Sequence, residues 1–310
     1  MKPVLLLEGI ALSFVWATAL LVPYVLDSTQ PILLAAGRYI IYGLVSVVLF
    51  VSARGSMRFT RAQWKTANVY AFTGNIGYYV TMALGVRYAG MTVAAMIIGI
   101  LPLSIMAFGN LQRKEISFTK LLVPGVLILM GIVGINVATA STLPSDKSLT
   151  EFVLGVIFSF ASLSFWTWYS VVNTSWLERN SEVSGSHWTT AIGICSLWQA
   201  LLLIPLMPLM TGESVSTSLQ NMDAWPLVLG ALLYMGIVNT WITTMWWNRL
   251  VRRIPLSLAG QLLVFATVAS IIYGHLVDRT WPDGLELLFV ALQITGVGFG
   301  VHQFSKHAAN

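Results

Sequence analysis

The chain has 310 residues, of which 56% are hydrophobic and only 9% are charged, and its mean hydropathy is +0.77. This composition excludes a soluble globular domain. The net charge of +5 lies in short clusters and not on one basic face, which excludes a nucleic-acid-binding protein. The single cysteine, Cys195, excludes an internal disulfide framework and a cysteine metal site. We therefore expect an integral membrane protein.

Ten runs of roughly 20 mostly apolar residues follow one another, and each is long enough to cross a bilayer as a helix. The first run is longer than the core of a signal peptide and no small-residue cleavage site follows it, so we expect it to be retained. The predicted fold class is all-α, with ten transmembrane helices. Their predicted ranges are 4–26, 31–53, 66–86, 91–111, 118–138, 151–174, 186–210, 225–247, 255–277 and 284–304.

Lysine and arginine gather in alternate connections between these runs. Connections rich in these residues stay in the cytoplasm, so the pattern predicts that both termini are cytoplasmic. The other side receives only Arg87, Lys147 and Arg279. The residues predicted to lie on the cytoplasmic side are Lys2, Arg54, Arg58, Arg61, Lys65, Arg113, Lys114, Lys120, Arg179, Arg249, Arg252, Arg253 and Lys306.

Arg38 stands inside the second run, roughly 10 Å below the expected membrane boundary at Pro31. Two interpretations stay open for it: a structural role, in which it caps carbonyls or pairs near an outer gate, and contact with a substrate carboxylate. Glu8 is the one candidate for a deep carboxylate, and it can equally be a solvated or snorkelling residue at the helix end. Proton coupling through a buried acid is therefore not expected.

Polar and aromatic side chains share one face on several predicted helices. In the sixth run, Trp166, Tyr169 and Asn173 are spaced three and four residues apart. Because polar groups that face lipid are costly, such faces should look inward. The competing interpretation is that these polar residues join helix to helix and that tryptophans at run ends, such as Trp246 and Trp247, form an interfacial belt. The candidate substrate-binding residues are Trp16, Arg38, Asn75, Tyr78, Tyr79, Trp166, Tyr169, Asn173, Thr240, Thr244 and Gln261.

A weak internal repeat appears at an offset of 165 residues, which aligns residues 71–134 with 236–299 without a gap. Five helices per half is an odd number, so the halves should be inverted relative to one another. The predicted organisation is a first repeat over 1–138, a periplasmic linker over 139–150 and a second repeat over 151–310, together forming one membrane domain. Gly99, Pro102 and Gly260 are predicted hinges in the fourth and ninth helices.

Three stretches resemble the drug/metabolite transporter superfamily, EamA type: "GRYIIYG" in the second helix, the fourth helix into the fifth, and the aromatic positions of the sixth. The second of these has Pro102 in mid-helix and Glu115 after a basic turn. The second half departs from the pattern, since Thr267 stands where Pro102 stands in the first. The resemblance implies a central cavity reached alternately from each side. A similar departure occurs among bacterial exporters of aromatic and other amino acids.

The expected function is that of a secondary transporter in the cell inner membrane, working as a monomer or a homodimer. The favoured substrate is a small amphipathic metabolite, above all an aromatic or large neutral amino acid, and the resemblance implies export. The alternatives are a carrier of multidrug or cationic compounds and a carrier of nucleobases or nucleosides. An intramembrane enzyme or a sensor is disfavoured, because the four histidines lie near helix ends at no metal-ligand spacing. No catalytic residue, metal, cofactor or nucleic-acid partner is expected; the partners are the substrate and the bilayer.

Overall fold

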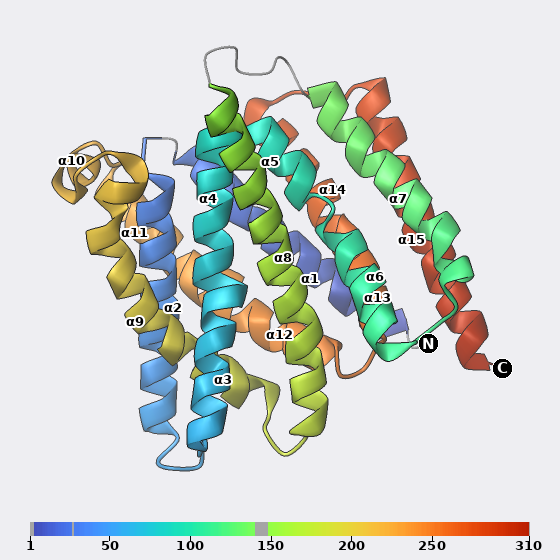
Figure 1. Cartoon of the computed structure of the whole chain (residues 1–310), viewed down its shortest axis with the longest axis horizontal. Coiled ribbons are helices and arrows are strands. Elements are labelled where there is room, and N and C mark those ends of the chain that lie inside the picture. Colours follow the sequence, from blue (N-terminus) through green and yellow to red (C-terminus); the bar gives the residue numbers. More distant parts are fainter. Residues whose placement is uncertain (1–2, 27, 140–147, 310) are drawn as a thin grey trace.

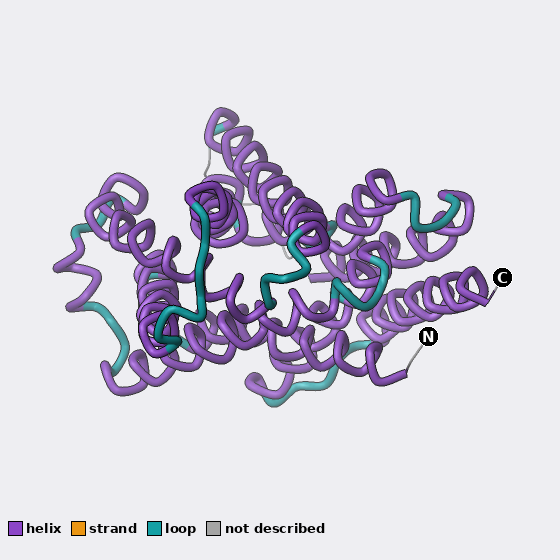
Figure 2. The backbone as a smooth tube through the Cα atoms, turned by 90° about the horizontal axis from the view of Figure 1, so that it is seen from below, coloured by secondary structure: helices purple, strands orange, loops and turns teal. Residues whose placement is uncertain are grey.

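A computed structural model describes residues 3–26, 28–139 and 148–309, and this part of the chain is helical and contains no strand (Figures 1 and 2). The all-α fold class is thereby confirmed. Most of the predicted linker, residues 140–147, lies outside the described residues.

Each of the ten predicted runs coincides with one helix or with a series of consecutive helical segments. Phe72–Ile76 and Tyr234–Ile242 are π-helical and carry the labels η1 and η2. The α-helices are α1 (Pro3–Val25), α2 (Pro31–Ser52), α3 (Arg61–Ala71), α4 (Gly77–Ala89), α5 (Met91–Ile98), α6 (Leu101–Arg113), α7 (Phe118–Thr139), α8 (Leu149–Arg179), α9 (Gly185–Thr211), α10 (Val215–Gln220), α11 (Trp225–Leu233), α12 (Thr243–Leu250), α13 (Leu256–Leu262), α14 (Val264–Asp278) and α15 (Gly284–Ala309).

Nine helical stretches of the described chain are long and apolar enough to cross a membrane. The third predicted run is helical without a break through α3, η1 and α4, yet it is not among the nine. Its sequence is less apolar because it carries residues such as Asn75, Tyr78 and Tyr79, whose location is described below. The protein is therefore a multi-pass membrane protein, and the crossing by the third helix stays a prediction.

The connections between helices lie at two opposite ends of the bundle (Figure 1). One end holds both described chain ends and the connections 53–60, 114–117, 180–184 and 251–255; we call it the basic end, because it carries Arg54, Arg113, Arg179 and Arg252 among others. Figure 2 shows that the two chain ends also lie close together when the bundle is viewed from below. The opposite end holds residues 28–30 and the connections 211–224 and 279–283, and we call it the open end because the cavity described below is accessible from it.

Three contacts join helices at corresponding places in the two halves, which are α2 with α9, α6 with α13 and α7 with α15. The other main contacts come as counterparts: α4 packs on α8 as α12 and η2 pack on α1, α3 packs on α9 as η2 packs on α2, and α5 and α6 pack on α8 as α14 packs on α1. Small residues allow the closest of these approaches, since a Cβ on Gly193 of α9 would lie 2.0 Å from the Ser46 hydroxyl oxygen of α2.

Local irregularities also recur at the offset of 165 residues. The segment η1 maps onto residues 237–241, which lie within η2. Lys114 and Arg279, which differ by 165 in number, both end a helix in the left-handed conformation, with φ of 50° and 54°. The fourth and ninth predicted helices are each interrupted near the middle, after Ile98 and after Leu262.

Candidate functional site

A cavity of about 1260 Å³ lies between the two halves of the bundle. Helices α1, α2, α4, α8, α12 and α14 and both π-helical segments contribute to its wall. At one end its lining residues, such as Val25, Val86 and Val277, are exposed, whereas at the other end Trp247 is only 1% exposed. The cavity is therefore accessible from the open end and closed toward the basic end.

Three tryptophans from three helices close the cavity. The ring centroids of Trp16 and Trp166 are 5.5 Å apart, those of Trp16 and Trp247 are 5.5 Å apart, and those of Trp166 and Trp247 are 5.8 Å apart. Tyr169 adds a fourth ring at 6.1 Å from Trp166. The indole N–H of Trp16 donates to the Thr243 hydroxyl at 2.7 Å, which fixes its orientation. We call these four rings the aromatic floor; they offer a broad apolar surface to a flat ligand.

Arg38 reaches the cavity from α2, and its Nε donates to the Thr240 hydroxyl at 2.7 Å. Its guanidinium carbon lies 5.3 Å from the centre of the Tyr39 ring, an arrangement that favours the cation. Thr240 in turn donates to the Met235 carbonyl at 2.7 Å. No carboxylate of the described residues lies within ion-pair distance of Arg38. The cation is thus oriented by a neutral partner and faces the cavity.

The two π-helical segments each supply a polar side chain to the wall. Asn75 in η1 and Thr240 in η2 are 165 positions apart, and both line the cavity. The Asn75 amide donates to the Ser196 hydroxyl at 2.9 Å, so its side chain is held from behind by α9. Such π-helical segments are rare and are often found at functional sites. A Cβ on Gly74 would lie 2.9 Å from the Tyr169 ring, so the backbone of η1 lies directly against the aromatic floor.

The structure brings most of the predicted binding residues into this one cavity. The residues that line it are Trp16, Arg38, Asn75, Tyr78, Tyr79, Trp166, Tyr169, Thr240 and Thr244, together with the predicted hinges Gly99 and Pro102.

Asn173, Gln261 and Gly260 are not part of the cavity wall. Gln261 is fully buried with no hydrogen-bond partner, and its side chain packs where a Cβ on Gly300 would lie. Gly260 faces α6, since a Cβ there would lie 2.9 Å from the Met106 backbone nitrogen. Helical periodicity placed Asn173 on an inward face, but an inward face can meet another helix as well as a cavity.

Asn173 belongs to a buried hydrogen-bonded cluster on the basic-end side of the aromatic floor. Its amide donates to the Asn248 side-chain oxygen at 2.9 Å and accepts from the Trp188 indole at 2.8 Å. Asn248 donates to the Thr189 hydroxyl at 3.0 Å. We call these residues the asparagine cluster; they join α8, α9 and α12 and fill the region on the basic-end side of the aromatic floor.

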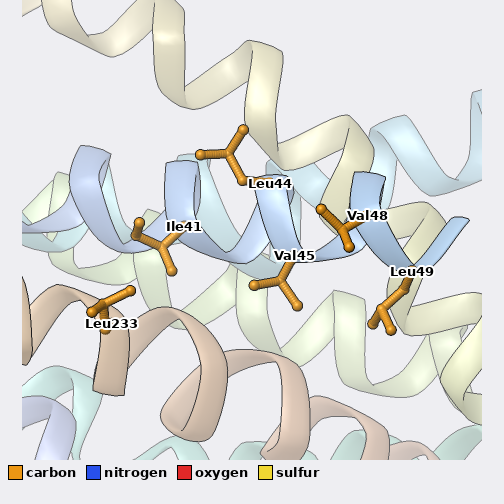
Figure 3. Close-up of a pocket in the computed structure, with 6 residues that line it drawn as sticks. All are labelled: Ile41, Leu44, Val45, Val48, Leu49 and Leu233. Atoms are coloured by element: carbon orange, nitrogen blue, oxygen red, sulfur yellow. The ribbon is translucent and has the colours of Figure 1, made fainter. Parts of the chain in front are cut away.

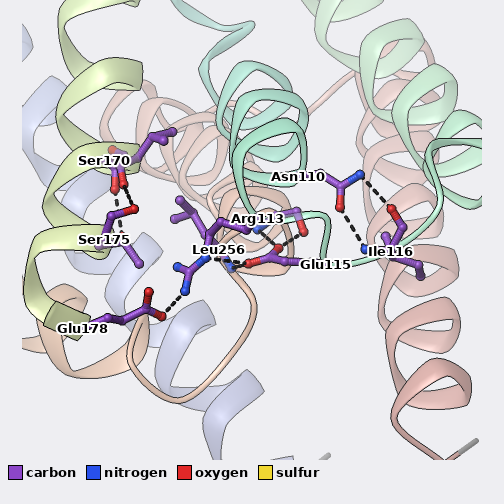
Figure 4. Close-up of polar contacts among 11 residues, drawn as sticks. Asn110, Arg113, Glu115, Ile116, Ser170, Ser175, Glu178 and Leu256 are labelled. Atoms are coloured by element: carbon purple, nitrogen blue, oxygen red, sulfur yellow. Dashed lines mark hydrogen bonds and ion pairs between the residues drawn. The ribbon is translucent and has the colours of Figure 1, made fainter.

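Ion pairs reinforce the closure at the basic end (Figure 4). Arg113 pairs with both Glu115 and Glu178. The Glu115 carboxylate accepts from the backbone N–H of Leu256 at 2.7 Å and from that of Ser257 at 2.9 Å, so it caps the start of α13. These contacts tie the ends of α6, α8 and α13 together.

Two further basic residues bridge helices at the same end. Arg249 pairs with Glu8 at 2.8 Å, and Glu8 does not line the cavity, which favours its interpretation as a helix-end residue. Arg252 donates to the Val183 carbonyl at 2.7 Å. Burial lowers the pKa of Arg252, and the nearby Glu182 opposes that effect.

Trp247 lines the cavity although it is not among the predicted binding residues. Its position at the end of an apolar run suggested the interfacial belt, whereas the structure buries it in the aromatic floor. Its spacing from Thr240 and Thr244, seven and three residues, is the signal that puts all three on one helix face. Its indole N–H is buried without a hydrogen-bond partner.

A second, smaller hollow of about 310 Å³ lies on the outside of the bundle between α2 and α11 (Figure 3). Its lining is entirely aliphatic, and it offers no polar group to a ligand. The described residues also contain no group of three His, Cys, Asp or Glu side chains that could hold a metal ion.

Comparison with known proteins points to a transporter family. Residues 2–137 match the model of the EamA-like transporter family. Inner membrane protein YtfF of Escherichia coli (strain K12) is 27% identical over 95% of this chain and 94% of its own length. An uncharacterized transporter, YyaM, of Bacillus subtilis (strain 168) is 24% identical over 92% of this chain and 88% of its own. One crystal structure superposes with a TM-score of 0.78 at 21% identity and covers 99% of both chains, which shows a shared fold.

Proposed function

We propose that this chain is an EamA-type member of the drug/metabolite transporter superfamily, as the match of residues 2–137 and the similar transporters support, and that it is a secondary carrier that exports a small amphipathic metabolite by alternating access. The observation that carries the proposal is a cavity of about 1260 Å³ between the halves, open at one end and closed at the other by aromatic and hydrogen-bonded layers. A carrier needs a site that opens to one side at a time, and this arrangement corresponds to one of the two required states.

The proposed architecture is ten transmembrane helices in two inverted repeats, residues 1–138 and 151–310. The recurrence of the π-helical segments, the helix interruptions and the left-handed helix ends at an offset of 165 supports it. The basic end is proposed to face the cytoplasm, since basic connections stay inside. The relative named an inner membrane protein supports placement in the cell inner membrane. The cavity would then be open to the periplasm, with both termini in the cytoplasm.

The favoured substrate is an aromatic or large neutral amino acid. The aromatic floor suits a flat apolar body, and the polar wall residues Asn75, Thr244 and Arg38 suit a polar end. A cationic multidrug substrate should bind less favourably, because the described residues that line the deep part of the cavity include a cation, Arg38, and no carboxylate. A nucleobase or nucleoside would also stack on the floor and is the second candidate.

Ligand-induced thermal stabilisation of the purified protein tests this proposal. Aromatic amino acids should raise the melting temperature in a concentration-dependent manner, since binding to the native state stabilises it by roughly 2.7 kcal/mol at a ligand concentration of 100 Kd. Trp166→Ala should abolish the shift, because it removes the centre of the aromatic floor. The matched control is Trp168→Ala, on the same helix but 45% exposed and outside the cavity. Stabilisation by cations alone would contradict the amino-acid proposal.

A further inference from the structure

The charge of the cavity is unbalanced, and this imbalance bears on what the cavity can bind. Asp278 is the only acidic side chain among the described lining residues, and it lies at the exposed open end, where it is already engaged. Arg87, also exposed and engaged, lies at the same end. Deeper in the cavity the charged group is Arg38. A ligand that reaches the aromatic floor therefore meets a positive charge with no acid opposite it.

The position of the Arg38 side chain is set by the packing of the helices around it. Its helix, α2, lies close to α11 and η2 because a glycine stands at each contact: a Cβ on Gly37 would lie 2.7 Å from Leu232 of α11, and one on Gly236 of η2 would lie 2.6 Å from Ile41. This approach brings the Thr240 hydroxyl within 2.7 Å of Nε of Arg38. Because the Thr240 hydroxyl donates its hydrogen bond to the Met235 carbonyl, its oxygen acts as the acceptor toward Arg38.

The consequence is a guanidinium held at Nε only. The described residues give Arg38 one hydrogen bond, which leaves the two terminal nitrogens to a ligand. Those two nitrogens form the fork that binds a carboxylate through two parallel hydrogen bonds. A partly buried cation without a counterion is unfavourable, so an anionic ligand would gain more here than a neutral one.

We propose that Arg38 is the anchor for a carboxylate group of the transported molecule, with Thr240 as its positioning residue, and that the cavity requires the carboxylate more strongly than any amino group. The apolar body of such a molecule would lie on the aromatic floor, and its carboxylate would meet the terminal nitrogens of Arg38. Carboxylic acids with a flat apolar body and no amino group then belong to the same substrate class as the aromatic amino acids. This inference rests on the proposed transport function and specifies the chemistry of its site.

Four compounds of similar shape separate the charges of the ligand. L-phenylalanine has both groups, 3-phenylpropionate has only the carboxylate, 2-phenylethylamine has only the amine, and 3-phenylpropanamide replaces the carboxylate by a neutral amide. Titrations of the full-length protein in detergent, followed by tryptophan fluorescence or melting temperature, give the Kd of each. We expect the two carboxylates to bind about 10- to 100-fold more tightly than the amide and the amine, the range of a charge-assisted hydrogen-bonded pair.

Variants assign this preference to Arg38 itself. Arg38→Gln should remove the preference for 3-phenylpropionate over the amide, because it weakens binding of the carboxylate far more than binding of the amide; a purely structural role would weaken both alike. Arg38→Lys should keep part of the preference, because it retains the charge and loses the fork. Thr240→Val should weaken carboxylates selectively and Thr240→Ser should not. Arg61→Gln, in the exposed first turn of α3, is the matched control with no expected change.

The outcomes separate this inference from the transport proposal. Equal binding of 3-phenylpropionate and 3-phenylpropanamide, or a preference that survives Arg38→Gln, overturns the anchor role and leaves the carrier proposal intact. Tighter binding of 2-phenylethylamine overturns it in favour of a cation carrier. If none of the four compounds binds, the aromatic substrate proposal falls and this inference falls with it.

Discussion

Some residues that are 165 positions apart in the sequence lie at opposite ends of the bundle, and they are exposed at one end and buried at the other. Val86 and Arg87, at the end of α4, line the cavity at the open end, and Val86 is 37% exposed. Val251 and Arg252, 165 positions later, lie at the basic end, where Val251 is 1% exposed and Arg252 donates to the Val183 carbonyl. The open and the closed end therefore differ in what the side chains at these positions contact.

The side chains at the closed end are larger and more strongly bonded. Trp247 and Asn248 fill the basic end, and their counterparts at the open end are Met82 and Ala83. Opening the basic end would require breaking the asparagine cluster and the ion pairs around it, whereas closing the open end would require making new contacts. A ligand changes this balance only by binding one state more tightly than the other. The side chains at the basic end thus set the cost of the transition.

The matched pair Val86→Cys and Val251→Cys tests the comparison most strongly. In a Cys195→Ser background, a membrane-impermeant maleimide should modify the cysteine at 86 about 1000-fold faster than the one at 251, because exposure of the latter requires local opening that costs about 4 kcal/mol. Labelling rates of the purified protein, measured by mass spectrometry, give the ratio directly. Equal rates would show that the closed end opens freely in the absence of substrate.

The orientation proposal can be examined with the same two variants. In right-side-out vesicles, only the cysteine at 86 should react with the impermeant reagent, since the open end is proposed to face outward. Denatured samples of both variants should react equally, which controls for intrinsic reactivity. Labelling at 86 in inside-out vesicles instead of right-side-out vesicles would reverse the proposed orientation.

Asn248→Leu should weaken the closed end next most strongly. The substitution leaves the Asn173 amide and the Thr189 hydroxyl without their partner in a buried region, which should reduce the free energy of unfolding by about 2–3 kcal/mol. Unfolding by SDS in mixed micelles measures this loss. Asn221→Ala, at an exposed position after α10, is the control with no expected change. An Asn248→Leu variant as stable as wild type would show that the asparagine cluster does not stabilise the closed end.

Much of the fold follows from the sequence because the membrane imposes a simple rule. Backbone groups in lipid must be bonded within helices, so apolar length alone located the helices to within a few residues. The least apolar run, 66–86, is also the one that carries Asn75 and the two cavity tyrosines. Here weak hydropathy marks a helix whose polar face lies on the cavity.

The site could be predicted only in part, because helical periodicity gives the face of a residue and not its neighbour. Asn173 and Trp166 share one face of α8, yet Trp166 lies in the aromatic floor and Asn173 bonds to Asn248 beyond it. The π-helical segments could not be anticipated at all, since no residue pattern for them was apparent. The bond between Arg38 and Thr240 likewise joins residues 202 positions apart and depends on the packing of α2 against η2.

Glu115→Gln should have a smaller effect on the closed end. The carboxylate accepts two backbone N–H groups at the start of α13, where a negative charge is favoured by the helix dipole. The amide can still accept one hydrogen bond, so we expect a loss of about 1–2 kcal/mol in the free energy of unfolding. The same SDS titration measures it. Because the side chain is only 10% exposed, an unchanged stability would contradict its role as the cap of α13.

Glu178→Gln should have the smallest effect, although Glu178 pairs with the same arginine. Its side chain is 44% exposed, against 10% for Glu115, and a pair so open to water contributes about 0.2–1 kcal/mol. Raising the salt concentration should therefore reduce the difference between wild type and Glu178→Gln, but should leave most of the effect of Glu115→Gln in place. If Glu178→Gln reduced the free energy of unfolding as much as Glu115→Gln, the exposed ion pair would stabilise the closed end as strongly as the buried contacts between the helix ends.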